Sequence, residues 1–295
     1  MRPGATLGAY GLVLAAALGG GALAGTAAGP IDVGDGTVHT SQEDQDMSAD
    51  IALPAGGLLV SQAGYQLTPE TRTIGDGEFA FTITGQDGRP VTDFVEQHER
   101  ELHLIVADRG LTEFHHVHPT MDHDGRWSVE LPALPAGSYR AFADFKPDGG
   151  EALTLGIDVT APGAAPTPSG LVATTRDEID GYDVTLAGEV AAGTASTVTV
   201  TVRHDGQIVT TEPYLGAGGH LVALRDGDLA FLHVHPLDEE PDGPVRFAVE
   251  VPSTGTYALF FDFLHDGEVR TARFVVEADT TATPDTDSPS HGDGH

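Results

Sequence analysis

The sequence predicts an all-β fold: two tandem immunoglobulin-like β-sandwich domains that follow an N-terminal hydrophobic helix. Apolar residues alternate with small or polar ones along short segments such as Phe79, Phe81 and Ile83, which is the period of a half-buried strand. Asp-Gly pairs, which favour tight hairpin turns, recur at short intervals between these segments. About seven short strands in roughly 105 residues are typical of an immunoglobulin-like sandwich.

The chain is a tandem duplication, because a pattern of histidines and their neighbours occurs twice at an offset of 117 or 118 positions. In each copy a single histidine lies thirteen positions before a His-Val-His-Pro segment, and an Asp-Phe pair follows further on. A repeat of this length corresponds to one domain. The matching residues are His103, His116, His118 and Asp144 in the first copy, and His220, His233, His235 and Asp262 in the second.

Changes in composition divide the chain into six parts. Acidic residues among Gly, Ser and Thr indicate a disordered linker, and a run of Pro and Ala indicates a hinge. We expect a signal or anchor helix at 1–30, the linker at 31–54, the first sandwich repeat at 55–162, the hinge at 163–169, the second repeat at 170–278, and a disordered tail rich in acidic residues and histidine at 279–295.

Residues 3–30 are uncharged, follow Arg2 and are rich in Ala, Gly and Leu. The stretch is long enough to span a bilayer, and its small residues, including Ala22-Leu23-Ala24, also suit signal-peptide cleavage. Cleavage and retention as an anchor both remain open. In either case we expect the two repeats to lie outside the cytoplasm, either anchored in the cell membrane or secreted.

The overall charge excludes several classes of partner. With 45 acidic and 14 basic residues the net charge is −31, so the chain should be repelled by nucleic acid and should contact a membrane only through its N-terminal helix. The absence of cysteine excludes disulfides and thiolate metal ligands. No nucleophile elbow, phosphate loop or ordered catalytic triad is present, so we expect a protein that is not an enzyme. The sequence names no protein partner.

The spacing predicts that each histidine triplet gathers on one face of one hairpin. The midpoint between His220 and His233 falls at Asp226-Gly227, a pair suited to a two-residue turn, which would place these two histidines directly opposite each other. In the first repeat the same arithmetic puts Arg109-Gly110 at the turn, with His103 opposite His116. His118 and His235 come two residues later and project to the same face. The other face should present Leu221, Leu232 and Val234.

A converging set of imidazoles predicts a metal site, and each repeat offers a carboxylate as a fourth member. Asp144 and Asp262 stand in apolar strands, where an unpaired carboxylate is costly, so they should either ligate the ion or orient a ligating histidine. Nitrogen and oxygen donors without sulfur favour Zn²⁺ or Cu²⁺. The predicted metal residues are His103, His116, His118 and Asp144, with His220, His233, His235 and Asp262.

Two other interpretations remain open. The histidines can be buried, neutral and hydrogen-bonded to the aspartates, in which case the chain is a cell-envelope interaction module with purely structural histidines. A mononuclear metal enzyme related to the cupins is the other, because Gly110 and Asp122 have the cupin spacing around His116 and His118. Arg140 and Ala258 argue against it, since they occupy positions where cupins tend to place a ligating histidine.

Several segments of the chain resemble a family of exported actinobacterial proteins, mostly uncharacterised and loosely labelled as heavy-metal-binding or secreted. The resemblance covers nearly all of residues 55–278 and implies an exported two-domain β protein, leaving its ligand open. The segments that carry it are Leu102-His103-Leu104-Ile105-Val106, His116-Val117-His118-Pro119, the segment 137–145 that ends in Asp144-Phe145, and the segment 214–222 around His220.

Overall fold

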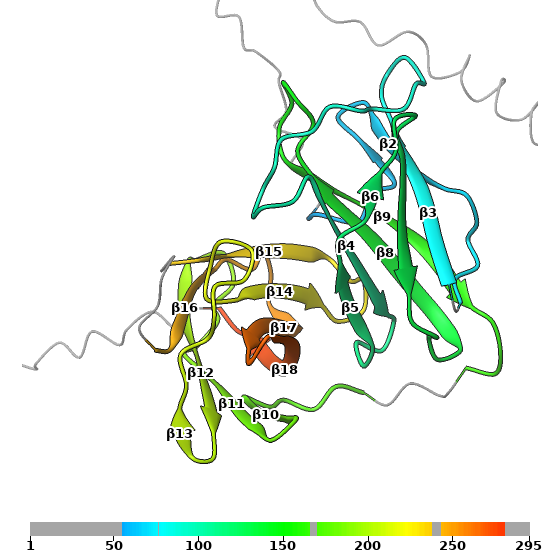
Figure 1. Cartoon of the computed structure of the whole chain (residues 1–295). Helices are drawn as coiled ribbons and strands as arrows, with labels where there is room; N and C mark the ends of the chain where they lie inside the picture. The colour runs from blue at the N-terminus through cyan, green and yellow to red at the C-terminus, as the bar shows by residue number, and fades with distance from the viewer. Residues whose placement is uncertain (1–54, 76, 166–169, 238–242, 281–295) are drawn as a thin grey trace, which may run out of the picture. The chain divides into compact units, whose positions relative to one another are not determined.

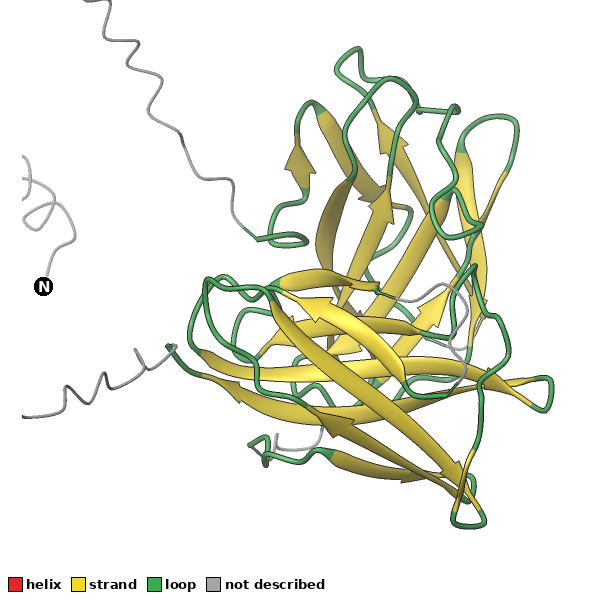
Figure 2. Ribbon diagram, turned by 90° about the vertical axis from the view of Figure 1, so that its left-hand side faces the viewer, coloured by secondary structure: helices red, strands yellow, loops and turns green. Residues whose placement is uncertain are grey.

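The computed structural model describes residues 55–75, 77–165, 170–237 and 243–280, all within one compact unit of the chain. These residues form strands, turns and loops, and no helix occurs among them (Figure 2). The described part of the chain therefore contains no helix able to cross a membrane. The predicted N-terminal helix at 1–30, the linker at 31–54, much of the hinge and most of the tail lie outside the described residues.

The first repeat is a sandwich of two antiparallel sheets (Figure 1). One sheet has the order β1-β2-β3-β7-β6, formed by Ser61–Gln62, Tyr65–Pro69, Gly77–Thr84, Arg126–Leu131 and Thr120–Met121. The other has the order β5-β4-β8-β9, formed by Phe114–Val117, Leu102–Asp108, Gly137–Phe145 and Leu153–Ala161. Phe79, Phe81 and Ile83 are buried between the sheets, as their alternation predicts.

The second repeat has the same two layers, joined by one continuous strand (Figure 1). Its strands in chain order are β10 Arg176–Ile179, β11 Tyr182–Ala187, β12 Ser196–His204, β13 Gln207–Ile208, β14 His220–Arg225, β15 Phe231–Pro236, β16 Val245–Val249, β17 Gly255–His265 and β18 Glu268–Ala278. The first part of β15 pairs with β14 and its last two residues pair with β16, so it passes from one sheet to the other. The equivalent segment of the first repeat is divided into β5 and β6.

Topology and a side-chain hydrogen bond place both sandwiches in the immunoglobulin-like class. In the first repeat the chain changes sheets between β3 and β4, between β5 and β6, and between β7 and β8, which is a Greek-key order. The hydroxyl of Tyr139, near the start of β8, donates to the carbonyl of Pro135 at 2.7 Å. Tyr257 does the same to Ser253 at 3.0 Å in the second repeat. This tyrosine corner is a hallmark of the class.

A third hydrophobic cluster joins the two repeats. The ring of Phe114 stacks on that of Phe260 with centroids 4.1 Å apart, and the ring of Phe142 packs on that of Phe231 at 5.5 Å. Phe114 and Phe231 are equivalent positions of the duplication, as are Phe142 and Phe260. Contacts that are reciprocal in this way define a pseudo-twofold interface, like that of a symmetric dimer within one chain.

The hairpin between the single histidine and the His-x-His segment differs from the predicted two-residue turn. The loop holds four residues in each repeat, because Arg225 pairs with Ala230 and Asp108 with Glu113. The reason lies in Leu111 and Leu229, which adopt left-handed φ angles of 54° and 60° and are fully buried in the interface cluster. The hydrophobic contact of these leucines therefore outweighs the preference of Asp-Gly for a tight turn.

The longer loop shifts the hairpin register by two residues. Ile105 lies opposite His116, and Val222 lies opposite His233, so the predicted pairs His103–His116 and His220–His233 are wrong. A shift by an even number leaves each histidine on the face that the sequence predicts. The opposite face is also as expected, since Leu221 and Val234 belong to the core of the second sandwich and Leu232 packs against it.

Candidate metal centre

The structure brings together the three histidines of the first repeat. His103 lies on β4, His116 on β5 and His118 directly after β5. One ring nitrogen from each lies within 4.8 Å of the other two. The ring centroids are 5.2 Å apart for His103 and His116, and 5.0 Å apart for each of the other two pairs. The three imidazoles thus surround one point.

A chain of hydrogen bonds passes through two of these imidazoles. Nε2 of His103 lies 2.9 Å from the carbonyl oxygen of Gln97, and Nδ1 of His103 lies 3.0 Å from Nε2 of His116. Nδ1 of His116 then lies 2.7 Å from Oδ2 of Asp262, a residue of the second repeat. The hydroxyl of Thr271 donates to the other oxygen of this carboxylate. The chain therefore crosses from one repeat to the other.

His118 differs from its two neighbours in having no partner for a buried atom. Its Nε2 makes no hydrogen bond with any described residue. Burial, and then the neighbouring His116 and His103, lower the pKa of His118 to about 3. Its imidazole is therefore neutral at physiological pH, which is the form that a metal ion requires of a histidine ligand.

In the second repeat the structure places His220 against the same cluster. His220 is buried at the start of β14, and its Nε2 lies 3.3 Å from the carbonyl oxygen of Leu215, much as Nε2 of His103 lies near that of Gln97. Its ring centroid is 6.3 Å from that of His103 and 6.2 Å from that of His116. The backbones of His233 and His235 lie on β15, while their side chains fall outside the described part of the chain.

The two predicted aspartates occupy equivalent buried positions. Asp144 pairs in register with His103, and Asp262 pairs in register with His220. Asp144 accepts a hydrogen bond from Thr154 at 2.7 Å, as Asp262 does from Thr271. The histidine bonded to Asp262, however, is His116 of the other repeat. A contact between the two repeats cannot be predicted from the spacing of residues within one repeat.

The sequence argument missed His98. It occupies a tight turn between Gln97 and Arg100, with left-handed φ angles at His98 (50°) and Glu99 (62°). Its ring centroid is 5.0 Å from that of His220 and 6.1 Å from that of His103. The second repeat has the same turn, in which Leu215 occupies the position of His98. His98 therefore has no histidine counterpart, and a search for repeated histidines does not find it.

Tyr214 is the other nearby group that the sequence argument missed. Its ring meets that of His220 edge to face with centroids 5.9 Å apart. Burial, with a smaller contribution from the Asp262 carboxylate, raises the pKa of Tyr214 to about 12. The phenol therefore stays neutral at physiological pH and contributes no negative charge to the cluster.

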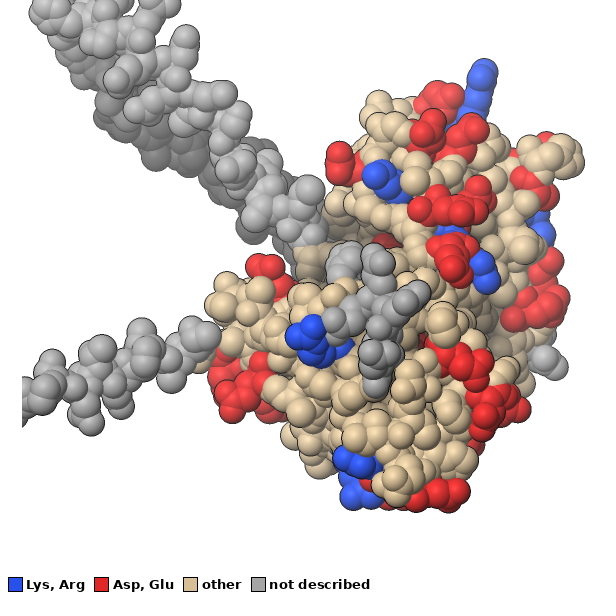
Figure 3. Space-filling model, turned by 60° about the vertical axis from the view of Figure 1, so that its left-hand side comes forward, with Lys and Arg blue, Asp and Glu red and all other residues tan. Residues whose placement is uncertain are grey.

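Arg140, which occupies the cupin ligand position, has a different role. Its guanidinium donates to the carbonyl oxygens of Gly57 and Leu58 at 2.8 and 2.9 Å and forms an ion pair with Asp158 at 2.8 Å. It thereby fixes the entry segment of the first repeat against β8 and β9. The face of the molecule drawn in Figure 3 carries more acidic than basic side chains, in line with the net charge of −31.

Comparison with known families identifies the duplicated unit. A family model described as a domain of unknown function (DUF8832) matches residues 60–163 and again 177–280. The chain belongs to this family. The two matches confirm the tandem repeat, and the family's description names no ligand or activity. Among curated proteins none matches the chain at a significant level.

Solved structures that match the chain include repeats of adhesion proteins and fibronectin type III domains. The BSP domain of a biofilm-associated protein is 13% identical with a TM-score of 0.21, over 75% of this chain and 30% of that one. A tetra-tandem repeat from a large adhesion protein is 14% identical with a TM-score of 0.25, over 74% and 50%. Two fibronectin type III domains of chicken tenascin are 8% identical with a TM-score of 0.22, over 72% and 98%. The chain thus spans half or less of the first two, and scores this low transfer no function.

Proposed function

We propose that the chain is an exported, membrane-anchored or secreted binding protein, without enzymatic activity, for a divalent transition metal, either Zn²⁺ or Cu²⁺. One ion is held by His103, His116 and His118 of the first repeat. The equivalent histidines of the second repeat, His220, His233 and His235, hold another.

The observation that carries this proposal is a count of protons along the hydrogen-bonded chain from Gln97 to Asp262. Three contacts, from the Gln97 carbonyl to His103, from His103 to His116 and from His116 to Asp262, need three protons. Two neutral imidazoles hold two protons, so a third positive charge, either a proton or a metal ion, belongs between the two rings. If an ion takes the place of the middle proton, each histidine donates its outer N–H to an oxygen and turns its inner lone pair to the metal. This arrangement is the usual one for metal-ligating histidines.

The spacing of the rings also suits one ion. Zinc–nitrogen bonds of about 2.0–2.1 Å at a tetrahedral angle place two ligand nitrogens roughly 3.3 Å apart and two imidazole centroids about 5.2 Å apart. The facing nitrogens of His103 and His116 are 3.0 Å apart, and the three centroid distances are 5.0–5.2 Å. Binding therefore needs only small movements of the rings.

Calorimetric titration of the whole chain with Zn²⁺ and with Cu²⁺ tests the proposal. His291→Ala and His295→Ala should be present in the protein used, so that the histidines of the tail do not contribute. We expect about two tight sites per chain, and about one after His103→Ala. A titration without saturable binding of either ion would exclude the metal-binding function.

A second candidate is a cell-envelope interaction module with structural histidines. The observation that favours it is that His103 and His116 already have a hydrogen-bond partner at every ring nitrogen. In that case purified protein contains no metal, and chelators leave its thermal unfolding unchanged. Metal analysis of protein isolated without added ions separates the two candidates.

A further inference from the structure

We propose that the two metal sites form one centre of two ions across the interface between the repeats, in which the aspartate of each repeat positions a metal-ligating histidine of the other repeat. This inference rests on the proposed function and deepens it. It replaces two independent sites, one per sandwich, with a composite centre that exists only while the repeats are packed together.

The direct observation is the contact between His116 of the first repeat and Asp262 of the second. Their side chains are 4% and 2% exposed, and Nδ1 and Oδ2 are 2.7 Å apart. A buried carboxylate accepting the outer N–H of a ligating imidazole fixes the ring orientation and makes the inner nitrogen a stronger donor. Thr271 holds the other carboxylate oxygen, so Asp262 is itself fixed in place.

The reciprocity of the interface extends this contact to the second site. Phe114 with Phe260 and Phe231 with Phe142 are contacts between equivalent pairs of residues, and Leu111 and Leu229 enter the same cluster. Asp144 with Thr154 repeats the pair Asp262 with Thr271. The pseudo-twofold relation therefore assigns Asp144 to the ion of the second repeat, as Asp262 serves that of the first.

Ring contacts show that the cluster itself is continuous across the interface. His220 of the second repeat lies beside His103 and His116, with ring centroids 6.3 and 6.2 Å from theirs. The ring of His98, from the first repeat, packs against that of His220 with centroids 5.0 Å apart. His98 itself lies in a turn with left-handed backbone angles.

The experiment uses a chain with one intact histidine triplet and measures which aspartate contributes to metal affinity at that site. The parent is the whole chain with His233→Ala and His235→Ala, which leaves the first triplet intact. Asp262→Asn and Asp144→Asn are added separately, and Asp228→Asn, a partly exposed turn residue paired with Arg225, serves as the matched control. Affinity for Co²⁺ is followed through its visible absorption and for Zn²⁺ by competition, with thermal unfolding in chelator measured in parallel.

A composite centre predicts that Asp262→Asn weakens binding by roughly 10–100-fold, the usual cost of losing the partner of a ligating histidine. The loss for Asp144→Asn should be clearly smaller, and the control should match the parent. A larger or equal loss for Asp144→Asn, or no loss for Asp262→Asn, would overturn the shared centre. In those cases the proposed function stands, because the parent still binds Co²⁺. A parent without saturable binding would instead remove the proposed function.

Discussion

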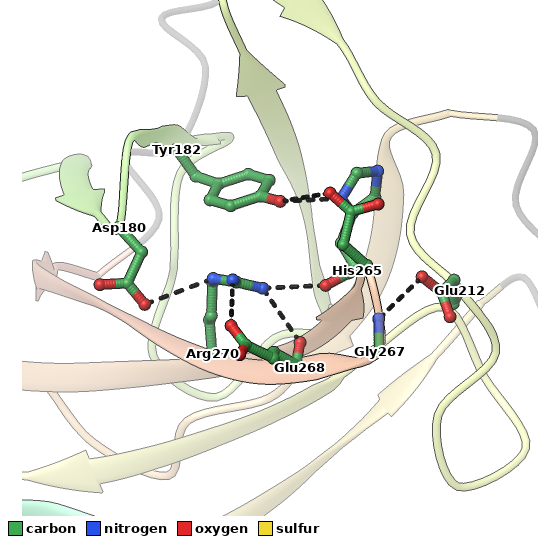
Figure 4. A network of polar contacts seen from close by, with 8 residues as sticks. Asp180, Tyr182, Glu212, His265, Gly267, Glu268 and Arg270 are labelled. Atoms are coloured by element: carbon green, nitrogen blue, oxygen red, sulfur yellow. Dashed lines mark hydrogen bonds and ion pairs between the residues drawn. The ribbon is translucent and has the colours of Figure 1, made fainter.

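Two clusters of polar side chains in this molecule differ in how their donors and acceptors are arranged. The interface histidine cluster, defined as His98, His103, His116, His118 and His220, brings imidazole rings together, and ring nitrogens of His103, His116 and His118 lie within 4.8 Å of one another. The Arg270 cluster of the second repeat, defined as Asp180, Tyr182, His265, Asp266, Glu268 and Arg270, brings donors to acceptors (Figure 4).

In the Arg270 cluster the contacts join groups of opposite kind. The guanidinium donates to the His265 carbonyl oxygen at 2.9 Å and to the Glu268 carboxylate at 2.6 Å, lies over the ring of Tyr182, and pairs with Asp180 at 3.4 Å. The Tyr182 hydroxyl meets Nδ1 of His265 at 2.8 Å. These contacts join a guanidinium to carboxylate and carbonyl oxygens, so they hold the β17–β18 hairpin against β11.

At the centre of the interface histidine cluster, ring nitrogens of His103, His116 and His118 lie within 4.8 Å of one another. Acceptors lie beside other ring nitrogens, at Gln97, Leu215 and Asp262. Under the proposed function, nitrogens that face one another mark the ligand site, whereas donors paired with acceptors mark the structural one. The four predictions that follow test this contrast, from the largest expected effect to the smallest.

Removing one member of each cluster should give opposite results. His116→Ala deletes a proposed ligand, so affinity for the ion of the first repeat should fall by more than the roughly 100-fold upper cost of losing an outer partner. Arg270→Ala removes the contacts that hold the β17–β18 hairpin against β11. It should lower the midpoint of thermal unfolding in chelator and leave affinity for that ion unchanged. Calorimetric titration and unfolding of both variants check this. Loss of metal binding in Arg270→Ala would break the contrast.

Metal should stabilise the fold through only one of the clusters. An ion that binds only the folded state adds about 2.7 kcal/mol to the free energy of unfolding when its concentration is 100 times Kd. Denaturant unfolding with and without Zn²⁺ measures the increment for each site. Arg270→Ala should show the same increase in unfolding free energy with Zn²⁺ as the parent. His116→Ala should lose the part of that increase that comes from the ion of the first repeat. Equal increments in the two variants would show that the ion binds elsewhere.

Much of the fold follows from the sequence because strand period and duplication report on local structure. The alternation at Phe79, Phe81 and Ile83 and the histidine faces depend only on side-chain direction, and both agree with the structure. The prediction of a two-residue turn at Asp226-Gly227 is wrong because it depends on local preference alone. Leu111 and Leu229 are buried in the cluster between the repeats, and this favours a four-residue loop. His98 and the pairing of Asp262 with His116 arise from packing between repeats, and no spacing within one repeat encodes them.

The hydroxyl of Tyr182 offers a narrower test of the structural cluster. Tyr182→Phe removes the hydroxyl that lies 2.8 Å from Nδ1 of His265 and donates to Asp266 at 3.5 Å, and it keeps the ring beneath Arg270. The free energy of unfolding should fall by about 1 kcal/mol, the net worth of a typical hydrogen bond, while metal affinity stays that of the parent. Denaturant unfolding in chelator resolves a change of this size. A change in metal affinity as large as that of His116→Ala would contradict the separation of the two clusters.

His98 gives the smallest and most selective effect, because its ring joins the interface histidine cluster from the side. His98→Asn keeps a residue that tolerates the left-handed backbone of the turn and removes the imidazole. Binding of the second equivalent of Co²⁺ should weaken by a few fold, less than the tenfold that corresponds to about 1.4 kcal/mol. Stability in chelator should be unchanged. His123→Asn, which alters an exposed histidine in another turn of the same repeat, is the matched control. If both variants bind the second ion as the parent does, His98 packs beside the centre without taking part in it.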